Sequence, residues 1–451
     1  MTECNQTGFL FEGHFSRRVE AHFDGSRMTT DGGALLLRAV DKKIRLLKRM
    51  ATCFRDGRDP ERVEHTLSEL LAQRVYALAL GYEDLNDHEE LRHDPLLGLL
   101  AGKRELEEPL AGKSTLNRLE LTPASGPHRY HKISYSSDAL DALLVEIFLE
   151  AYAKPPQEIV LDLDVTDTPL HGEQEARFFH GYYGHYCYLP LYIFCGEHLL
   201  CARLRPSNQD ASAGSVAEVE RIVRQIRRRW PRVGIILRGD SGFCREELMA
   251  WCEKHGVDYV FGLARNSRLR RKIGRQMREA KQEHRCTGKA ARVFAEFSYR
   301  TRKSWSRSRR VVAKAEYLEK GENPRFVVTA LEVRAWPAQQ LYERFYCARG
   351  EMENRIKEQL SLFSDRLSTE TMRANQLRLY FSSLAYVLVH ALRRLALAGT
   401  EWASAQVQTI RLRLLKIAAE VRLTARRIWV RYSQAYPWKA LFAAAYAALS
   451  G

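Results

Sequence analysis

The stretch between residues 155 and 264 constrains the fold most, because short apolar runs alternate there with amphipathic segments. Runs of strand length occupy 158–164, 188–195, 199–204, 233–240 and 257–264, and helical patterns occupy 215–230 and 245–256. Strands that alternate with helices form open α/β sheets. The runs 188–195 and 199–204, with Gly196 between them, predict a hairpin at one side. We therefore expect an α/β sheet in the middle of the chain.

Helical patterns flank this sheet on both sides. Apolar residues recur at helical spacing from about residue 28 until Pro155-Pro156, which predicts an all-α domain. A long helix is expected over 338–360, and the Arg-rich stretch 391–451 is expected to be helical. Residues 1–27 show no clear pattern and are interpreted as a leader.

Positive charge is concentrated in one segment. The chain has 71 Lys and Arg against 55 Asp and Glu, a formal net charge of +16. Residues 265–310 hold 17 Lys and Arg against three acids, so 17 − 3 = +14 of that charge lies there. A polyanion would relieve the resulting repulsion through phosphate contacts, which predicts nucleic-acid binding. A disordered basic loop is the alternative.

Within this basic segment, the cluster expected to contact DNA consists of Arg268, Arg270, Arg271 and Lys272. Aromatic residues, including Trp305, are interleaved with the basic ones. They suit stacking on bases, and equally the buried face of strands.

Several classes of protein are excluded by the sequence. No run approaches the 18 or more apolar residues that a membrane-spanning helix needs. The first residues lack the layout of a secretory signal peptide, so we expect a cytoplasmic, nucleoid-associated protein. Nine cysteines form no C-x-x-C pair. An odd number without that pairing argues against a disulfide framework and against a structural zinc site.

Three acids stand where metal-dependent chemistry would need them. Asp164 and Asp240 end apolar runs, and Glu353 lies inside the expected helix 338–360. Acids at the carboxyl ends of adjacent strands face one crevice. Clustered carboxylates favour hard cations such as Mg²⁺ or Mn²⁺, and two such ions about 3.5–4 Å apart suit phosphodiester displacement.

Each acid also has a simpler interpretation. Asp162 shares a strand face with Asp164, so alternation alone does not separate the two, and Asp167 is a further alternative. A strand-end aspartate is often only a turn former. For Glu353 the alternative is a solvated helix face.

The sequence Tyr346-x-x-Arg349-x-x-x-Glu353 resembles the Tyr–Arg–Glu–Lys signature of bacterial insertion-sequence transposases of the DDE superfamily. Asp164-Val165-Thr166 resembles the first strand-end motif of that family, and LRGDSGF (237–243) resembles the second. The segments 171–183 and 81–95 are also similar to this transposase branch. The three acids occur in the family's order, 76 and then 113 positions apart.

The resemblance implies an RNase H-like mixed-sheet catalytic core with a β-rich insertion, flanked by a helical N-terminal domain and a helical C-terminal region. The implied order is a leader (1–27), a helical, candidate DNA-binding domain (28–154), the first part of the core (155–264), the basic β-rich insertion (265–337), the second part of the core with the Glu helix (338–390) and the helical C-terminal region (391–451). Asp164, Asp240 and Glu353 would be the catalytic acids and would hold two Mg²⁺ ions.

The resemblance also implies DNA contacts. Tyr346 and Arg349 would contact DNA, although an intrahelical salt bridge with Glu353 is the alternative for Arg349. The Lys of the signature would fall at position 360, which is Leu, and Lys357 lies on nearly the same helix face one turn earlier. Trp305 is the candidate for handling a flipped base, with Trp336 as the alternative.

The expected function is that of an insertion-sequence transposase that binds terminal inverted repeats and target DNA, then hydrolyses and transfers strands. It would act as a homodimer on paired ends, without a membrane. Residues 391–448 would pair two ends or pack as a lid. The alternatives are a metal-dependent nuclease without strand transfer and a catalytically silent DNA-binding protein of the same fold.

Overall fold

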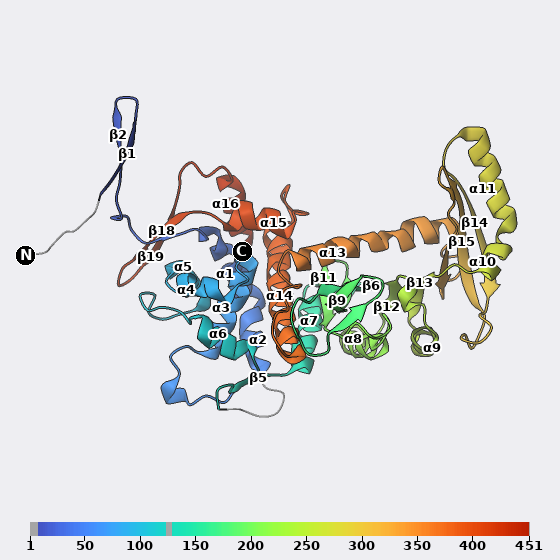
Figure 1. Cartoon of the computed structure of the whole chain (residues 1–451), viewed down its shortest axis with the longest axis horizontal. Helices are drawn as coiled ribbons and strands as arrows, with labels where there is room; N and C mark the ends of the chain where they lie inside the picture. Colours follow the sequence, from blue (N-terminus) through green and yellow to red (C-terminus); the bar gives the residue numbers. More distant parts are fainter. Residues whose placement is uncertain (1–7, 123–128, 451) are drawn as a thin grey trace, which may run out of the picture. The chain divides into compact units, whose positions relative to one another are not determined.

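The computed structural model describes residues 8–122 and 129–450, which form two compact units. One unit combines residues 8–51, 56–119 and 391–450, and is called the terminal unit because it draws on both ends of the chain. The other spans the described part of 120–390 together with 52–55, and is called the sheet unit. Figure 1 shows the chain coloured along its sequence.

Among the described residues, nine strands of the sheet unit form one mixed sheet in the order β11-β10-β6-β12-β13-β17-β15-β14, with β16 paired to β15. Their bounds are β6 (Glu158–Val165), β10 (Leu191–Cys195), β11 (His198–Arg203), β12 (Gly234–Gly239), β13 (Asp258–Leu263), β14 (Ala291–Tyr299), β15 (Arg309–Leu318), β16 (Gly321–Glu322) and β17 (Arg325–Thr329). The central strands β6, β12 and β13 are parallel, and the outer pairings are antiparallel. The strands predicted between 155 and 264, including the hairpin β10–β11, are confirmed.

Both faces of this sheet are covered. Alternate residues such as Leu161, Leu237 and Phe261 belong to a buried cluster with α7 (Ser137–Glu150), α8 (Ser215–Arg229) and α9 (Glu246–His255). Their neighbours on the opposite face, such as Ile236 and Val260, pack against Leu341 and Phe345. Figure 1 shows α8 and α9 on one side of the strands and α13 on the other. Because side chains alternate along a strand, Asp162 and Asp164 lie on the face covered by the second group.

The predicted helix 338–360 is helical throughout but not uniform. It runs through α12 (Ala338–Gln340), a π-helical turn (Leu341–Tyr346), a 3-10 turn (Cys347–Arg349) and α13 (Gly350–Leu360). Tyr346 and Arg349 therefore lie on the irregular part, and Glu353 lies on the regular helix. Such π-helical turns are frequent at functional sites.

The basic segment extends the main sheet and is not all β. Two helices that the sequence interpretation missed, α10 (Ser267–Lys272) and α11 (Gly274–Thr287), precede β14. Met277 and Ala280 of α11 are buried, and this helix lies beside β14 and β15 (Figure 1). The chain then returns through β17, which pairs with β13. The insertion thus shares one sheet with the strands that carry Asp164 and Asp240.

The terminal unit is mainly helical, with α1 (Leu35–Ile44), α2 (Leu46–Thr52), α3 (Leu67–Leu80), α5 (Pro95–Ala101), α6 (Lys113–Glu120) and α16 (Lys439–Ser450) among its helices. Residues 9–21, within the stretch that the sequence predicts to be a leader, form the hairpin of β1 (Phe9–His14) and β2 (Arg17–Ala21). The helix α7, expected in the N-terminal domain, belongs to the sheet unit.

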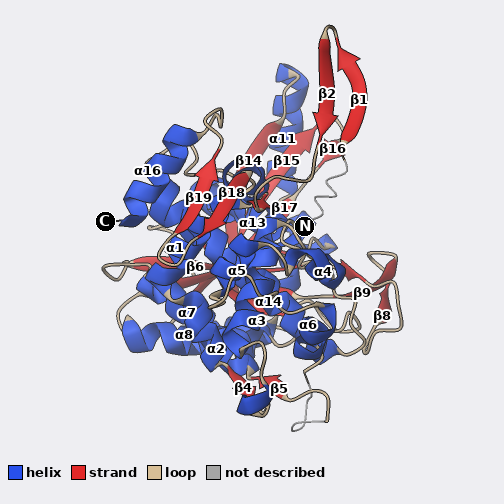
Figure 2. Ribbon diagram, turned by 90° about the vertical axis from the view of Figure 1, so that its left-hand side faces the viewer, coloured by secondary structure: helices blue, strands red, loops and turns tan. Residues whose placement is uncertain are grey.

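The expectation of a purely helical C-terminal region is wrong. Strands β18 (Ala419–Leu423) and β19 (Ile428–Tyr432) pair with each other (Figure 2), and β18 also pairs with β3 (Met28–Thr29). Ala419 and Val421 are buried while Glu420 and Arg422 between and after them are not, which is the alternation of a strand and not of a helix.

The C-terminal region also completes the terminal unit. The guanidinium of Arg411 donates hydrogen bonds to the carbonyls of Leu78 and Ala79, and Lys416 pairs with Asp31 at 2.9 Å. The hydroxyl of Tyr432 donates to the Gly32 carbonyl at 3.0 Å. These contacts make 391–450 part of the same packed unit as the first helices.

Among the described residues, no helix has the length and apolar character needed to cross a membrane.

Candidate active site

Two aspartates lie next to each other at the ends of the adjacent parallel strands β6 and β12. The register pairs Arg238 with Asp162 and Gly239 with Leu163, so Asp164 and Asp240 come next, at the carboxyl ends of both strands. Asp240 caps a short 3-10 turn and accepts a 2.8 Å hydrogen bond from the Gly242 amide. The Asp164 carboxylate accepts one from the Val165 amide at 2.9 Å. The sheet therefore holds both carboxyl groups at one edge, as predicted from the sequence.

The guanidinium of Arg349 joins two of the three predicted acids. Its Nη1 lies 3.1 Å from Asp164 Oδ2, and its Nη2 lies 3.7 Å from Glu353 Oε1. The Asp164 side chain is 14% exposed and the Glu353 side chain 55% exposed. The intrahelical pair with Glu353 is present, and the structure adds the contact with Asp164, which joins the helix to the strand.

The pKa of Asp164 depends on its burial and on the charged side chains around it. Burial raises this pKa to about 6, the positive charge of Arg349 opposes that rise, and the negative charges of Asp240 and Glu353 add to it. Asp240 and Glu353 are therefore both close enough to Asp164 to act on its charge.

Asp162 is engaged elsewhere. Arg238 donates to both of its carboxylate oxygens, at 2.5 and 2.8 Å, and also to the Phe345 carbonyl at 2.6 Å. Asp162 is 5% exposed. The buried pair fastens β6 to β12 and to the helical stretch above them, which gives Asp162 a structural role that alternation in the sequence did not reveal.

Gly262, on β13, is a site residue that the sequence interpretation missed. A Cβ atom at this position would lie 2.6 Å from the Tyr346 hydroxyl and 2.9 Å from the Ser241 amide nitrogen. Only glycine thus lets the Tyr346 ring approach the end of β12. Burial raises the pKa of Tyr346, with a contribution from Asp240, so the hydroxyl lies near that acid. The available signal was a glycine inside a strand, which often marks a close approach.

A small sheet that contains the hairpin of β8 (Phe178–His180) and β9 (His185–Tyr188) follows Asp164 in the chain. With β7 (Thr168–Pro169), these strands form a three-stranded sheet in the order β7-β9-β8. Asp167 pairs with His185 at 2.8 Å. The pKa of Tyr183 is raised to about 12 by burial and by the charges of Asp167 and Asp164. The sequence interpretation assigned no role to this hairpin.

The donor types suit a hard divalent cation, because Asp164, Asp240 and Glu353 offer only carboxylate oxygens. Within 8–122 and 129–450, however, no group of three or more His, Cys, Asp or Glu side chains is close enough to hold a metal ion. The ion pair between Arg349 and Asp164 supplies a positive charge at this place. The residues therefore fit such a cation by chemistry, and Arg349 would have to release Asp164 when the cation binds.

The basic residues predicted to contact DNA lie on α10. Arg271 is exposed, and Arg270 pairs with Glu322 at 2.9 Å. Arg268 lies over the Tyr299 ring and Lys272 over the Phe297 ring, at 5.3 and 5.1 Å from the ring centroids. Lys357 is exposed on α13, one turn after Glu353.

The expected base contact by Trp305 is not met by its side chain in this structure. Trp305 is 4% exposed and packs edge-on against Tyr299, with Arg309 over its ring. Trp336, the alternative, is partly buried against Phe345 at 5.0 Å between ring centroids. Of the interleaved aromatic residues, Tyr299 and Trp305 are buried, while Phe294 and Phe297 are partly buried against the two sides of the sheet, in agreement with the alternative of a buried strand face.

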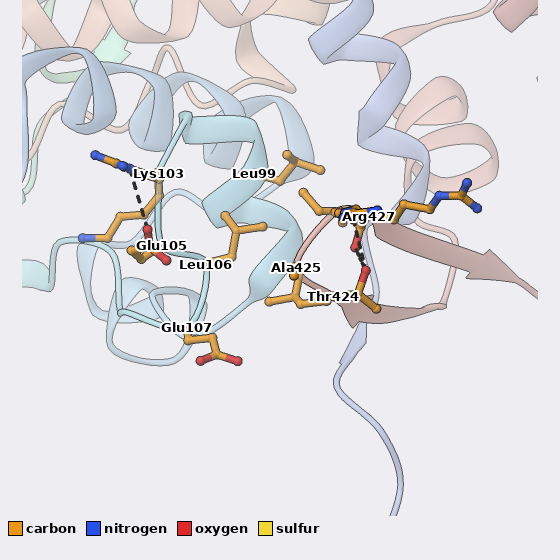
Figure 3. A pocket seen from close by; sticks show the side chains of 12 residues that line it. Leu99, Lys103, Glu105, Leu106, Glu107, Thr424, Ala425 and Arg427 are labelled. Atoms are coloured by element: carbon orange, nitrogen blue, oxygen red, sulfur yellow. Dashed lines mark hydrogen bonds and ion pairs between the residues drawn. The ribbon is translucent and has the colours of Figure 1, made fainter.

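A cavity of about 660 Å³ in the terminal unit contains none of the predicted site residues. It lies between the segment 103–107 and the β18–β19 turn, where the Thr424 hydroxyl donates to the Arg427 carbonyl (Figure 3). Its lining mixes acids such as Glu105 and Glu107 with Arg426 and Arg427. No single ligand chemistry follows from this mixture.

Comparisons with known proteins identify the family to which the chain is similar. The model of the family described as "Transposase DDE domain group 1" matches residues 11–451. No curated protein matches the chain. Among solved structures, the "Cryo-EM structure of piggyBac transposase synaptic complex with hairpin DNA" is similar over 86% of this chain and 80% of that chain, with 10% identity and a TM-score of 0.44. That similarity is too low to support an argument.

Proposed function

Because the chain belongs to the family of transposases with a group 1 DDE domain, and is therefore a DNA-cleaving enzyme, we propose that Asp164, Asp240 and Glu353 are its catalytic acids. The observation that carries this proposal is the position of Arg349 between Asp164 and Glu353, together with the effect of Asp240 and Glu353 on the pKa of Asp164. Asp240 and Glu353, which are 76 and 189 positions from Asp164 in the chain, thereby both act on the charge of Asp164. On this proposal the strands β11 to β13 with α7, α8 and α9 form an RNase H-like core.

The three acids would hold two Mg²⁺ or Mn²⁺ ions, which when bound supply Lewis-acid stabilisation of the phosphate and lower the pKa of the attacking water or hydroxyl. The chain's own residues position the reaction. The Gly242 amide fixes the orientation of Asp240, and Arg238 with Asp162 holds β6 level with β12. Once Arg349 releases Asp164, its guanidinium is placed to bind a phosphate oxygen of the DNA.

The proposed reaction has two displacements at phosphorus. In the first, a water oxygen bonds to the phosphorus at the end of the element, and the bond to the 3′ oxygen breaks, so that oxygen leaves as a 3′-hydroxyl. In the second, this hydroxyl attacks a phosphodiester of target DNA and a target 3′ oxygen leaves. No covalent intermediate with the protein is required.

Binding of terminal inverted repeats of a bacterial insertion sequence belongs to the same proposal. The exposed Arg271 and its neighbours on α10 would contact phosphates, as would Lys357 on α13, and these contacts set the register of the DNA without reading its sequence. We further propose a homodimer on paired ends, and a cytoplasmic site of action at the nucleoid.

The test compares Asp164→Asn, Asp240→Asn and Glu353→Gln with the unaltered protein on DNA that carries the element's own ends. We expect each variant to lose Mg²⁺-dependent cleavage while end binding persists, because the ligand charge disappears and the phosphate contacts stay. Glu351→Gln, an exposed acid on the same helix, is the matched control and should cleave normally. Full cleavage by any of the three variants removes that acid from the site.

Asp162→Asn separates a structural acid from a catalytic one. It should lower stability because Arg238 loses its buried partner, yet still cleave at a temperature where it is folded. The nuclease alternative predicts nicked DNA without joined products, so a strand-transfer assay with target plasmid distinguishes it from a transposase.

A further inference from the structure

The hairpin Phe178–Tyr188 exposes a group of large aromatic side chains to solvent. Phe178, Phe179, Tyr182 and Tyr186 are 40%, 58%, 87% and 45% exposed. Single exposed aromatic residues are common, but Phe179 and Tyr186 are paired on one face of the hairpin and Tyr182 lies at the turn between their strands. A group of exposed aromatic rings of this kind marks a binding surface.

These rings are held in defined positions. Phe179 and Tyr186 are partners across β8 and β9, and their rings meet edge to face at 5.6 Å. The guanidinium of Arg177 lies 4.7 Å from the centroid of the Tyr186 ring. At the turn, the ring centroids of Tyr182 and Tyr183 are 5.1 Å apart. Gly184 has a φ of +76°, a backbone conformation that favours glycine. A surface fixed in this way loses little conformational entropy when it binds a ligand.

The hairpin is fastened to the strand end that carries Asp164. Asp167, three residues after Asp164, pairs with His185 of β9 at 2.8 Å. The Leu170 amide donates to the Tyr186 carbonyl at 2.9 Å. A DNA strand whose phosphate reaches Asp164 would therefore pass close to the aromatic patch.

The charge of the hairpin indicates which part of DNA it suits. Residues 171–188 contain Glu173, Glu175 and one arginine, Arg177, a formal charge of 1 − 2 = −1 with neutral histidines. Arg177 is already paired with Glu173 at 2.5 Å. This surface offers little to phosphates, in contrast to α10, and much to the faces of unpaired bases.

We propose that the hairpin Phe178–Tyr188 binds unpaired bases of the DNA strand that enters the active site, by stacking them on Phe179, Tyr182 and Tyr186. The location of that strand rests on the proposed function. The hairpin would thus perform the stacking expected for Trp305, whose ring is covered by protein.

The test measures binding of fluorescein-labelled oligo(dT) and of a duplex of equal length to the full chain, by fluorescence anisotropy without divalent metal. In the variant Phe179→Ala/Tyr182→Ala, we expect the affinity for oligo(dT) to fall about tenfold for each stacked base that is lost. Duplex affinity and the salt dependence of binding should stay unchanged. Tyr182→Phe, which keeps the ring, should bind like the unaltered protein.

Tyr130→Ala is the matched control, since Tyr130 is 66% exposed in the same unit but outside the hairpin. An unchanged affinity in the double variant, an equal loss in Tyr130→Ala, or an equal loss for duplex and single strand would overturn the proposal. So would a change in oligomeric state alone, which would make the patch a protein interface. Thermal melts exclude unfolding as the cause. Because no cleavage is measured, failure of the acid variants to lose cleavage would overturn the catalytic assignment without affecting this result.

Discussion

The guanidinium of Arg349 lies 3.1 Å from the carboxylate of Asp164, and so ties the helical stretch 338–360 to the end of a central strand. The two residues are 185 positions apart in the chain. Since the same guanidinium lies 3.7 Å from Glu353, its positive charge serves two of the three acids at once. This arrangement gives the site its electrostatic character and leads to the first two predictions.

Replacement of Arg349 should shift the pH dependence of cleavage. Arg349 lowers the pKa of Asp164, which burial raises to about 6. Without this charge the pKa rises further, so the ionised form that a metal requires appears only at higher pH. We therefore expect the rising limb of the cleavage profile to move to higher pH in Arg349→Ala. Arg344→Ala, an exposed arginine on the same helical stretch, should leave the limb in place, and an equal shift in both variants would contradict the assignment.

Asp164→Asn should be more stable than the unaltered protein at neutral pH. The pKa of Asp164 is about 6 in the fold against 3.8 for an aspartate side chain in water, so the unfolded chain loses its proton first as the pH rises. The folded protein therefore loses stability between these two values and stays destabilised above them. Asparagine cannot ionise and escapes this loss, which amounts to at most about 3 kcal/mol. Denaturant melts should show the advantage at about pH 7 and its disappearance at about pH 4, whereas a constant difference would contradict the prediction.

Neutralising Arg268, Arg270, Arg271 and Lys272 together should weaken DNA binding and flatten its salt dependence. Each lost phosphate contact reduces the slope of log affinity against log salt by about 0.9. Arg271 should contribute most, because Arg270 already pairs with Glu322 and the other two lie over aromatic rings. Titrations at several salt concentrations measure the slope. Arg224→Gln, an exposed arginine on α8, is the control, and an unchanged slope in the quadruple variant would show that α10 does not touch the backbone.

Gly262→Ala should impair both stability and cleavage. The added Cβ would lie 2.6 Å from the Tyr346 hydroxyl, so the ring or the end of β12 must move, at a cost of about 1–3 kcal/mol. Adding Tyr346→Phe to Gly262→Ala removes that hydroxyl and should restore part of the lost stability. The rescue should be incomplete because the close contact with the Ser241 amide nitrogen remains. Gly274→Ala, whose Cβ would have no neighbour closer than 3.9 Å, should be harmless. The absence of any rescue would mean that the backbone contact dominates.

Removal of residues 396–451 should unfold the terminal unit instead of producing a folded protein that fails to pair ends. The deleted segment includes Arg411, Lys416 and Tyr432, which bond to the first helices, and β18, which pairs with β3. Loss of solubility, or a melt of the soluble protein with one transition fewer, would support this prediction. A soluble truncated protein with both transitions would contradict it.

The sequence predicted the central sheet well because each strand there is short, apolar and bounded by turn residues. It placed Asp164 and Asp240 at strand ends, and the register of β6 against β12 agrees. It did not separate Asp162 from Asp164, because alternation treats residues two apart as equivalent. Arg238 makes the distinction, and its pairing with Asp162 exists only once the two strands are adjacent.

The remaining differences also arise from tertiary contacts. Trp305 stands among basic residues in the sequence, yet its ring packs in the core with Tyr299. The strand β18 pairs with the nearby β19 and also with Met28–Thr29, nearly four hundred positions earlier, and no local pattern could indicate that second partner. The catalytic roles of the acids and the DNA contacts stay predictions.

Because the terminal unit is assembled from both ends of the chain, it cannot be completed until synthesis is nearly finished. Its first segments are made early, but β18 and the contacts of Arg411 and Tyr432 become available only after the 390 − 119 = 271 residues from 120 to 390 have followed. At about 5–20 residues per second this delay lasts roughly 15–50 s, during which the apolar faces of the early helices lack their final cover. The sheet unit can fold while it emerges from the ribosome, whereas the terminal unit must wait, and meanwhile it is the part of the nascent chain that chaperones would bind.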